Sequence, residues 1–177
     1  MVDGVTLAAR LRTTSGPSTL ALGAAIALLT CPTTTALRAE GAPRIVRSDR
    51  VGSLLELANA QRARVGVPPL RADAKLMKAA QAQAEQAASA GRLQHVLPEA
   101  RYARPQDRLD AFGYNWRAFA ENIAYGHANA AAAIDGWMNS PGHRKNLLSP
   151  AYTELGTGFA TDADGRPYDV QVFGRPR

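Results

Sequence analysis

The chain has 177 residues, 46% of them hydrophobic and 20% charged, a balance typical of a globular protein that excludes an intrinsically disordered chain. The formal net charge is +6, but the basic residues are spread along the chain without interleaved aromatic residues. This distribution argues against a nucleic-acid-binding protein. The length is sufficient for one domain with its own hydrophobic core.

The N-terminus has the pattern of a targeting segment. Basic residues precede an apolar run at 19–30, which is shorter than the roughly 20 residues that a membrane span requires. Small residues follow, so we expect cleavage of a secretory signal after Ala36 or Ala39. A lipoprotein site at Cys31 and a retained membrane anchor are the alternatives.

We therefore divide the chain into a signal peptide or anchor at 1–39, a linker at 40–50 and one domain at 51–175. Cleavage after Ala39 would remove the single cysteine, so the exported domain would depend on its core and not on disulfides. The expected location is outside the cell, in the periplasm or at the cell envelope.

The first two helices are expected at 51–65 and 73–90, where apolar residues recur at helical spacing. Gly66 and two prolines end the first helix. Asp73 is the expected N-cap of the second helix, and Gly91 stands where that helix ends.

The middle of the chain is less regular. We expect a short helix near 104–112, and a turn or short helical piece around Glu121 within the ambiguous segment 118–125. A third main helix is expected at 128–139, ended by the Ser-Pro-Gly sequence at 140–142.

The C-terminus has the pattern of a β-hairpin. Segments 155–161 and 167–173 alternate between apolar and polar residues, and Asp164-Gly165 between them is a turn signal.

Four side chains able to exchange protons or bind metal stand out. His95, one of three histidines, follows the second expected helix, and Glu121, His143 and Glu154 lie in turn-rich segments downstream. Two neutral imidazoles and a carboxylate could complete a zinc shell with an open water position, although no HExxH motif is present. A His–Glu pair could instead do acid–base chemistry without metal, or simply stabilise buried loops.

Other polar and aromatic residues have simpler interpretations. His127 is expected to be exposed or to cap a helix, and Ser140 lacks the GxSxG context of a nucleophile. Trp137 is expected in the core. Asp162 and Asp164 fit a hairpin turn better than a calcium loop.

Six segments, in order, resemble the bacterial branch of the CAP superfamily, whose shared unit is the SCP domain. They are LLELANAQRARVGVPPLRAD, GRLQH, AENIAYG, GWMNSPGHRKNLL, YTELGTGF and QVFG, and together they span residues 53–174. The resemblance implies an α+β fold, an α-β-α sandwich with a small, mainly antiparallel sheet between helical layers.

The resemblance also implies a central cleft with two histidines and two acidic residues. His95 and Glu121 match the first of each by motif. Ser140 stands where eukaryotic members have a glutamate in a WxxE segment, so His143 and Glu154 are expected to complete the cleft with the two roles exchanged. The C-terminal segment 168–174 lacks the Trp and Thr usual in the bacterial pattern.

From the resemblance we expect a binding module for a divalent cation, a lipid-like ligand or both. His95 and His143 are the expected ligands of a cation such as zinc, and a small apolar molecule or an envelope component is the expected partner. A metal-assisted or His/Glu-dependent hydrolase, and a purely structural domain, are the alternatives. We assign no catalytic residue, and we expect membrane contact only through an uncleaved signal or a lipid anchor.

Overall fold

The computed structural model describes residues 44–177, with side chains from Asp49 onward. The predicted signal peptide or anchor, the cleavage sites and Cys31 lie outside these residues. The elements in chain order are α1 (Arg44–Arg64), β1 (Arg71–Ala72), α2 (Ala74–Ala90), α3 (Pro105–Ala111), β2 (Trp116–Tyr125), α4 (Ala130–Asn139), α5 (Pro141–Leu147), β3 (Glu154–Thr161) and β4 (Pro167–Pro176). Within this range no helix combines the length and apolar character needed to cross a membrane.

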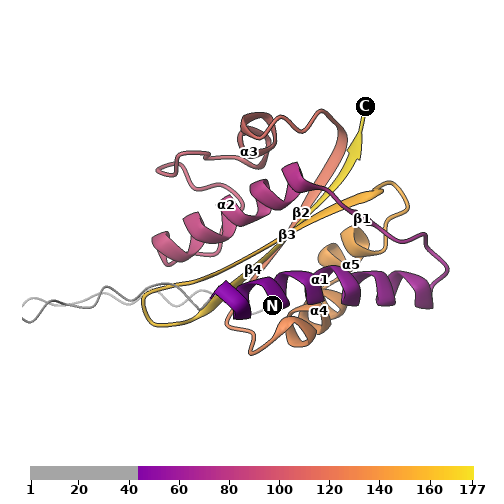
Figure 1. Cartoon of the computed structure of the whole chain (residues 1–177), viewed down its shortest axis with the longest axis horizontal. Coiled ribbons are helices and arrows are strands. Elements are labelled where there is room, and N and C mark those ends of the chain that lie inside the picture. Colours follow the sequence, from indigo (N-terminus) through magenta and orange to yellow (C-terminus); the bar gives the residue numbers. More distant parts are fainter. Residues whose placement is uncertain (1–43) are drawn as a thin grey trace, which may run out of the picture. The chain divides into compact units, whose positions relative to one another are not determined.

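The four strands form one sheet in the order β1-β3-β4-β2. β1 pairs with β3 in parallel, and the remaining pairs are antiparallel. Helices α2 and α3 cover one face of the sheet, and α1, α4 and α5 cover the other (Figure 1). The α+β fold and the α-β-α sandwich expected from the sequence are confirmed.

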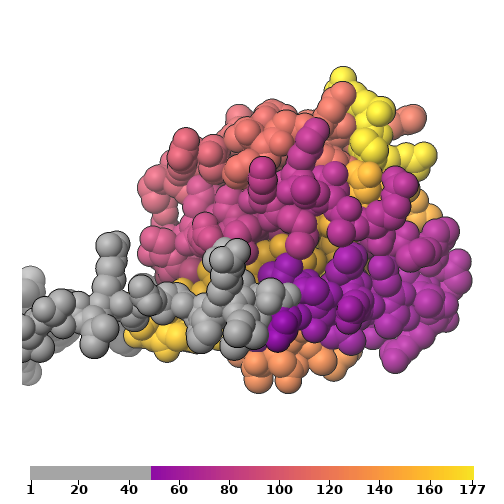
Figure 2. All heavy atoms as spheres, viewed as in Figure 1, coloured from indigo at the N-terminus to yellow at the C-terminus, as the bar shows by residue number. Residues whose placement is uncertain are grey.

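Each helical layer has its own hydrophobic cluster against the sheet. On the first face, α1, α4 and α5 pack on the strands through Leu54, Ala58, Ile134, Trp137, Leu147, Leu155 and Phe173. On the second face, α2 and α3 pack through Leu76, Ala80, Leu109, Ile123, Val170 and Val172. With all atoms drawn, the C-terminal hairpin shows between the two layers (Figure 2).

Helix α2 lies unusually close to β3. A Cβ atom added to Gly158 would come within 2.4 Å of the Ala80 carbonyl carbon, and one added to Gly156 within 2.0 Å of the Leu76 carbonyl carbon. Small residues on both surfaces, the alanines of α2 and these two glycines, therefore allow the helix backbone to approach the strand.

A buried ion pair fixes α1 to the sheet. The Arg50 guanidinium donates to both carboxylate oxygens of Asp169 at 2.7 Å, and also to the backbone carbonyls of His127 and Ala128. Burial raises the pKa of Asp169, and the hydrogen bonds from Arg50 partly offset that shift. Arg50 thus joins α1, β4 and the segment before α4.

The predicted helices are present with shifted ends. Asp73 caps α2 through the amides of Lys75 and Leu76, and Gly91 ends it in the left-handed conformation. Helix α1 begins at Arg44, inside the expected linker. Ser140 ends α4, but Pro141 then begins α5, because proline is compatible with the first turn of a helix. His143 therefore lies on a helix and not in a turn.

The expectation of a turn or helical piece around Glu121 is wrong. This residue lies in β2, which pairs with β4 from Trp116 opposite Pro176 to Tyr125 opposite Tyr168. Both faces of β2 are covered by helices, so its sequence lacks the alternation of a half-exposed strand. The two-residue strand β1 was also missed, because so short a segment has no periodicity.

The close contact between α2 and β3 is testable. We expect Gly158→Ala to destabilise the protein by about 1–3 kcal/mol or more, because the new methyl group overlaps helix backbone. Gly52→Ala is the matched control, since Gly52 lies in helix α1 with open space around it. There the same substitution should be stabilising by about 0.5–1 kcal/mol. Chemical denaturation measures both, and equal effects would contradict the close-packing account.

Candidate functional site

Strand β2 presents Glu121 toward the α2 and α3 layer. The Glu121 side chain is only 3% exposed, and its two carboxylate oxygens have different partners. Oε1 lies 2.9 Å from Nδ1 of His95, and Oε2 accepts a hydrogen bond from the Arg108 guanidinium at 2.8 Å. One buried carboxylate thus connects an imidazole to a buried cation.

His95 lies in the loop between α2 and α3, and its side chain is 49% exposed. A carboxylate accepts hydrogen bonds, so the short contact with Glu121 favours the proton on Nδ1 of the ring. In the neutral imidazole, Nε2 then carries the free lone pair. The arrangement leaves a basic nitrogen on a half-exposed ring.

Arg108 binds the backbone of the same loop. Its side chain, on α3, is 1% exposed, and its guanidinium also donates to the backbone carbonyls of His95 and Tyr102, both at 3.2 Å. Arg108 Nε is one of two buried side-chain polar atoms without a partner in the described range; the other is Gln83 Oε1. The Gln83 amide donates to the Gln94 carbonyl at 2.6 Å, so two buried side chains hold adjacent carbonyls of this loop.

His143 approaches from the other helical layer. Burial lowers the pKa of its imidazole, and the charge of nearby His95 lowers it further. Its Nδ1 lies 3.0 Å from the Ser140 hydroxyl, and its carbonyl accepts from the buried amide of Asn122 at 3.2 Å. The Asn146 amide donates to Asn122 in turn, so α5 is anchored to β2.

Glu154 has other partners among the described residues. It begins β3 opposite Gly174, accepts a hydrogen bond from the Tyr114 hydroxyl at 2.7 Å and lies 3.4 Å from the Arg71 guanidinium. Burial and the Glu154 carboxylate raise the pKa of Tyr114 well above its usual range. Among the contacts described for residues 49–177, none joins Glu154 to His95, Glu121 or His143.

Once its site is described, the chain can be compared with known proteins. Residues 55–173 match the family described as CAP, the cysteine-rich secretory protein family. The chain belongs to the CAP family. Its expected membership, taken from the six sequence segments, is confirmed.

Two bacterial relatives illustrate the similarity. The uncharacterized protein YkwD of Bacillus subtilis is 37% identical over 122 residues, which is 69% of this chain and 46% of that protein. An extracellular SCP-domain protein of Bacillus anthracis has a solved structure with 30% identity and a TM-score of 0.66, covering 73% of this chain and 41% of that one. This CAP chain therefore spans less than half the length of each.

A second solved structure is that of NaASP2 with Zn²⁺. It is 16% identical, has a TM-score of 0.53, and covers 77% of this chain and 85% of that one. At this identity the likeness concerns the fold alone.

The site residues of this CAP-family chain supply only part of a metal-binding site. In the portion of the chain that the structure describes, no three His, Cys, Asp or Glu side chains converge to hold a metal ion. The Glu121 carboxylate already accepts from His95 and Arg108, so the remaining donors are the Nε2 atoms of two imidazoles. Two such donors with water fit a weak, exchangeable site, whereas a catalytic zinc has three protein ligands.

The other sequence candidates have structural roles. Trp137 is buried and donates to the Ile123 carbonyl, and Asp162 accepts from the amides of Asp164 and Arg166 in the hairpin turn. The His127 ring lies against Gly136 of α4. Sequence reasoning missed Arg108, because nothing distinguishes it from the other basic residues of the chain.

Arg108 should be essential for this site. We expect Arg108→Gln to destabilise the protein by about 3–5 kcal/mol, because it leaves the buried Glu121 carboxylate without its cation. Arg104→Gln, on an exposed arginine at the start of the same helix, should cause little change. Thermal and chemical denaturation compare the two, and similar losses would mean that Arg108 is not needed to compensate Glu121.

His143 should make stability depend on pH. Its pKa in the folded protein is below the ordinary value of 6.5, so the unfolded chain binds the proton more readily. The stability that His143 contributes is therefore fully present above about pH 6.5, the ordinary pKa. It is lost as the pH falls through the lower pKa of the folded protein. When the pH is lowered from neutral to mildly acidic, we expect the unfolding free energy of the His143→Gln variant to fall less than that of the unchanged protein. An identical pH dependence would exclude this role for His143.

Proposed function

We propose that this CAP-family chain is a binding module that takes a divalent cation, such as zinc, between His95 and His143. The observation that carries the proposal is the hydrogen bond between His95 Nδ1 and the buried Glu121 carboxylate. A histidine that ligates a metal through one ring nitrogen commonly donates its other N–H to a carboxylate. Glu121 supports His95 in that way, with Arg108 behind it.

The electrostatics of the second histidine support the same ligand. A metal ligand must be a neutral imidazole, and the lowered pKa of His143 keeps this ring neutral at neutral pH. The charge of His95 is the second cause of that lowered pKa, after burial, and this coupling supports a cation shared by the two histidines.

The donor set favours binding over hydrolysis. With two imidazoles as ligands, a cation would keep most of its coordination positions for water and would exchange readily. In addition, the Glu121 carboxylate accepts hydrogen bonds from Arg108 and His95, so it is already engaged and is a poor candidate for a general base. The hydrolase alternative therefore has less support than the binding module.

We place this binding outside the cytoplasm. The apolar run at 19–30 has the pattern of an export signal, and the Bacillus anthracis relative is an extracellular protein. The ligand would then be met at the cell envelope or beyond it.

Zinc titration of the metal-stripped protein tests the proposal. We expect saturable binding of one ion, weakened at least about tenfold by His95→Ala or His143→Ala and about 10–100-fold by Glu121→Gln. Affinity should fall as the pH is lowered, because protons compete for the imidazoles. His127→Gln, at the third histidine, is the control and should bind zinc normally.

Two results would contradict the proposal. One is the absence of saturable zinc binding in a folded protein, and the other is equal weakening by His127→Gln and His143→Ala. A lipid-like ligand would then be the better candidate. The observation in its favour is a largely apolar groove of about 390 Å³ between α1 and the start of α4, lined by Leu57, Ala128 and Ala130 among others.

A further inference from the structure

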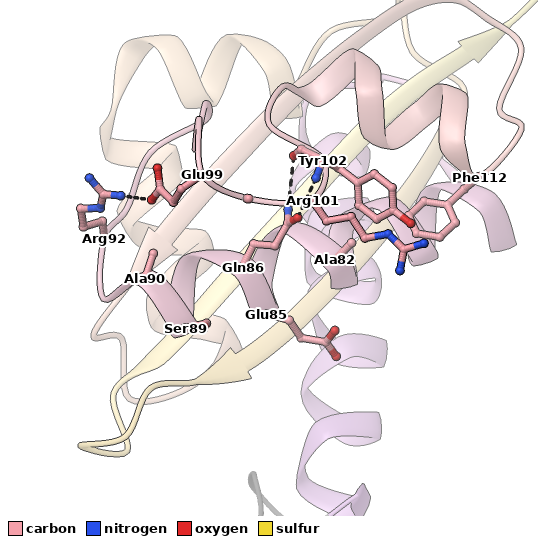
Figure 3. Close-up of a pocket in the computed structure, with 11 residues that line it drawn as sticks. Ala82, Glu85, Gln86, Ser89, Ala90, Arg92, Glu99, Arg101, Tyr102 and Phe112 are labelled. Carbon is pink, nitrogen blue, oxygen red and sulfur yellow. Dashed lines mark hydrogen bonds and ion pairs between the residues drawn. The ribbon is translucent and has the colours of Figure 1, made fainter.

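An open pocket of about 680 Å³ lies between α2 and the loop that follows it. Helix α2 forms the floor of the pocket, and the loop at 99–102 with Phe112 forms its wall (Figure 3). This volume lies within the range of sites that hold small organic ligands. The proposed cation site uses none of its lining residues.

Hydrogen bonds to the Tyr102 backbone tie the loop at 99–102 to α2 and α3. The Gln86 side chain accepts from the Tyr102 amide at 3.0 Å and donates to its carbonyl at 3.4 Å (Figure 3). Arg108 donates to the same carbonyl at 3.2 Å. The wall is therefore fixed before any ligand arrives, which reduces the ordering cost of binding.

The two ends of the pocket differ in chemistry. Arg92 and Glu99 form an ion pair at one end, and the rings of Tyr102 and Phe112 meet edge to face at the other, with centroids 5.5 Å apart (Figure 3). Small side chains, including those of Ala82, Ser89 and Ala90, lie along the helix between them. Ala90 comes eight positions after Ala82, so this floor is about 12 Å long.

Charge selects the kind of ligand. Arg92 and Glu99 neutralise each other. The Glu85 carboxylate accepts from the Gln81 amide and keeps its charge, but it points away from the loop at 99–102 (Figure 3). The Arg101 guanidinium lies 5.2 Å from the centre of the Tyr102 ring, and it takes part in none of the ion pairs described for residues 49–177. A cation stacked on an aromatic wall offers its free N–H donors to a carboxylate.

We propose that this pocket binds the carboxyl-terminal end of a peptide that finishes in an aromatic residue. The terminal carboxylate pairs with Arg101, and the last side chain packs against Tyr102 and Phe112. About four extended residues span the 12 Å floor, where the Ser89 hydroxyl is available to a peptide group. A fatty acid could also pair its carboxylate with Arg101, but its chain would leave the Ser89 hydroxyl without a partner and has no ring to pack on Tyr102 and Phe112.

Titration of the isotope-labelled protein with acetyl-Ala-Ala-Phe, followed by NMR in the presence of EDTA, tests this inference separately from the cation proposal. We expect saturable shifts at Ala82, Ser89 and Phe112. The C-terminal amide of the same peptide should bind about tenfold more weakly, because it lacks the charge that pairs with Arg101.

Three variants make the test specific. Arg101→Gln should abolish the difference between acid and amide, whereas Arg117→Gln, on an exposed arginine of β2, should preserve it. Ser89→Trp, at an exposed helix position, should block binding without loss of thermal stability. Equal affinity for acid and amide, equal effects of the two arginine variants, tighter binding of palmitate to this pocket, or no saturable shift at millimolar peptide would each overturn the inference.

Discussion

The ion pair between Arg108 and Glu121 is the interaction on which the rest of the site depends. Each side chain would be strongly unfavourable if buried alone, and each is almost fully shielded from solvent here. Their pairing makes burial possible and fixes the carboxylate in one orientation. That orientation determines which nitrogen of His95 carries its proton, and the same guanidinium holds the loop that carries the histidine.

Strand β2 connects the two helical layers at this point. Adjacent residues of a strand face opposite ways, so Glu121 contacts the α2 and α3 layer while Asn122 contacts α5. The two histidines are therefore positioned by neighbouring residues of one strand. A register shift of a single residue between β2 and β4 would exchange the two faces and separate both histidines from their partners.

Local signals in the sequence predicted much of the fold. Asp73 and Gly91 predicted the two ends of α2, because helix capping depends on a few neighbouring residues. Asp164-Gly165 predicted the turn between β3 and β4 for the same reason. The role of Glu121 in a doubly covered strand, and that of Arg108, depend on tertiary contacts that no local pattern encodes. Glu154 was grouped with the histidines by its residue type and by resemblance. Its described partners are Tyr114 and Arg71, so its place in the cleft stays a prediction.

The central claim is that Glu121 fixes the proton of His95 on Nδ1 and leaves Nε2 free for a ligand. Two-dimensional NMR correlation of the imidazole nitrogens at mildly alkaline pH tests it most directly, because the protonated and unprotonated ring nitrogens have distinct shifts. We predict that His95 has a protonated Nδ1 and that added zinc perturbs its Nε2. A proton on Nε2, or a His95 ring unaffected by zinc, would contradict the account.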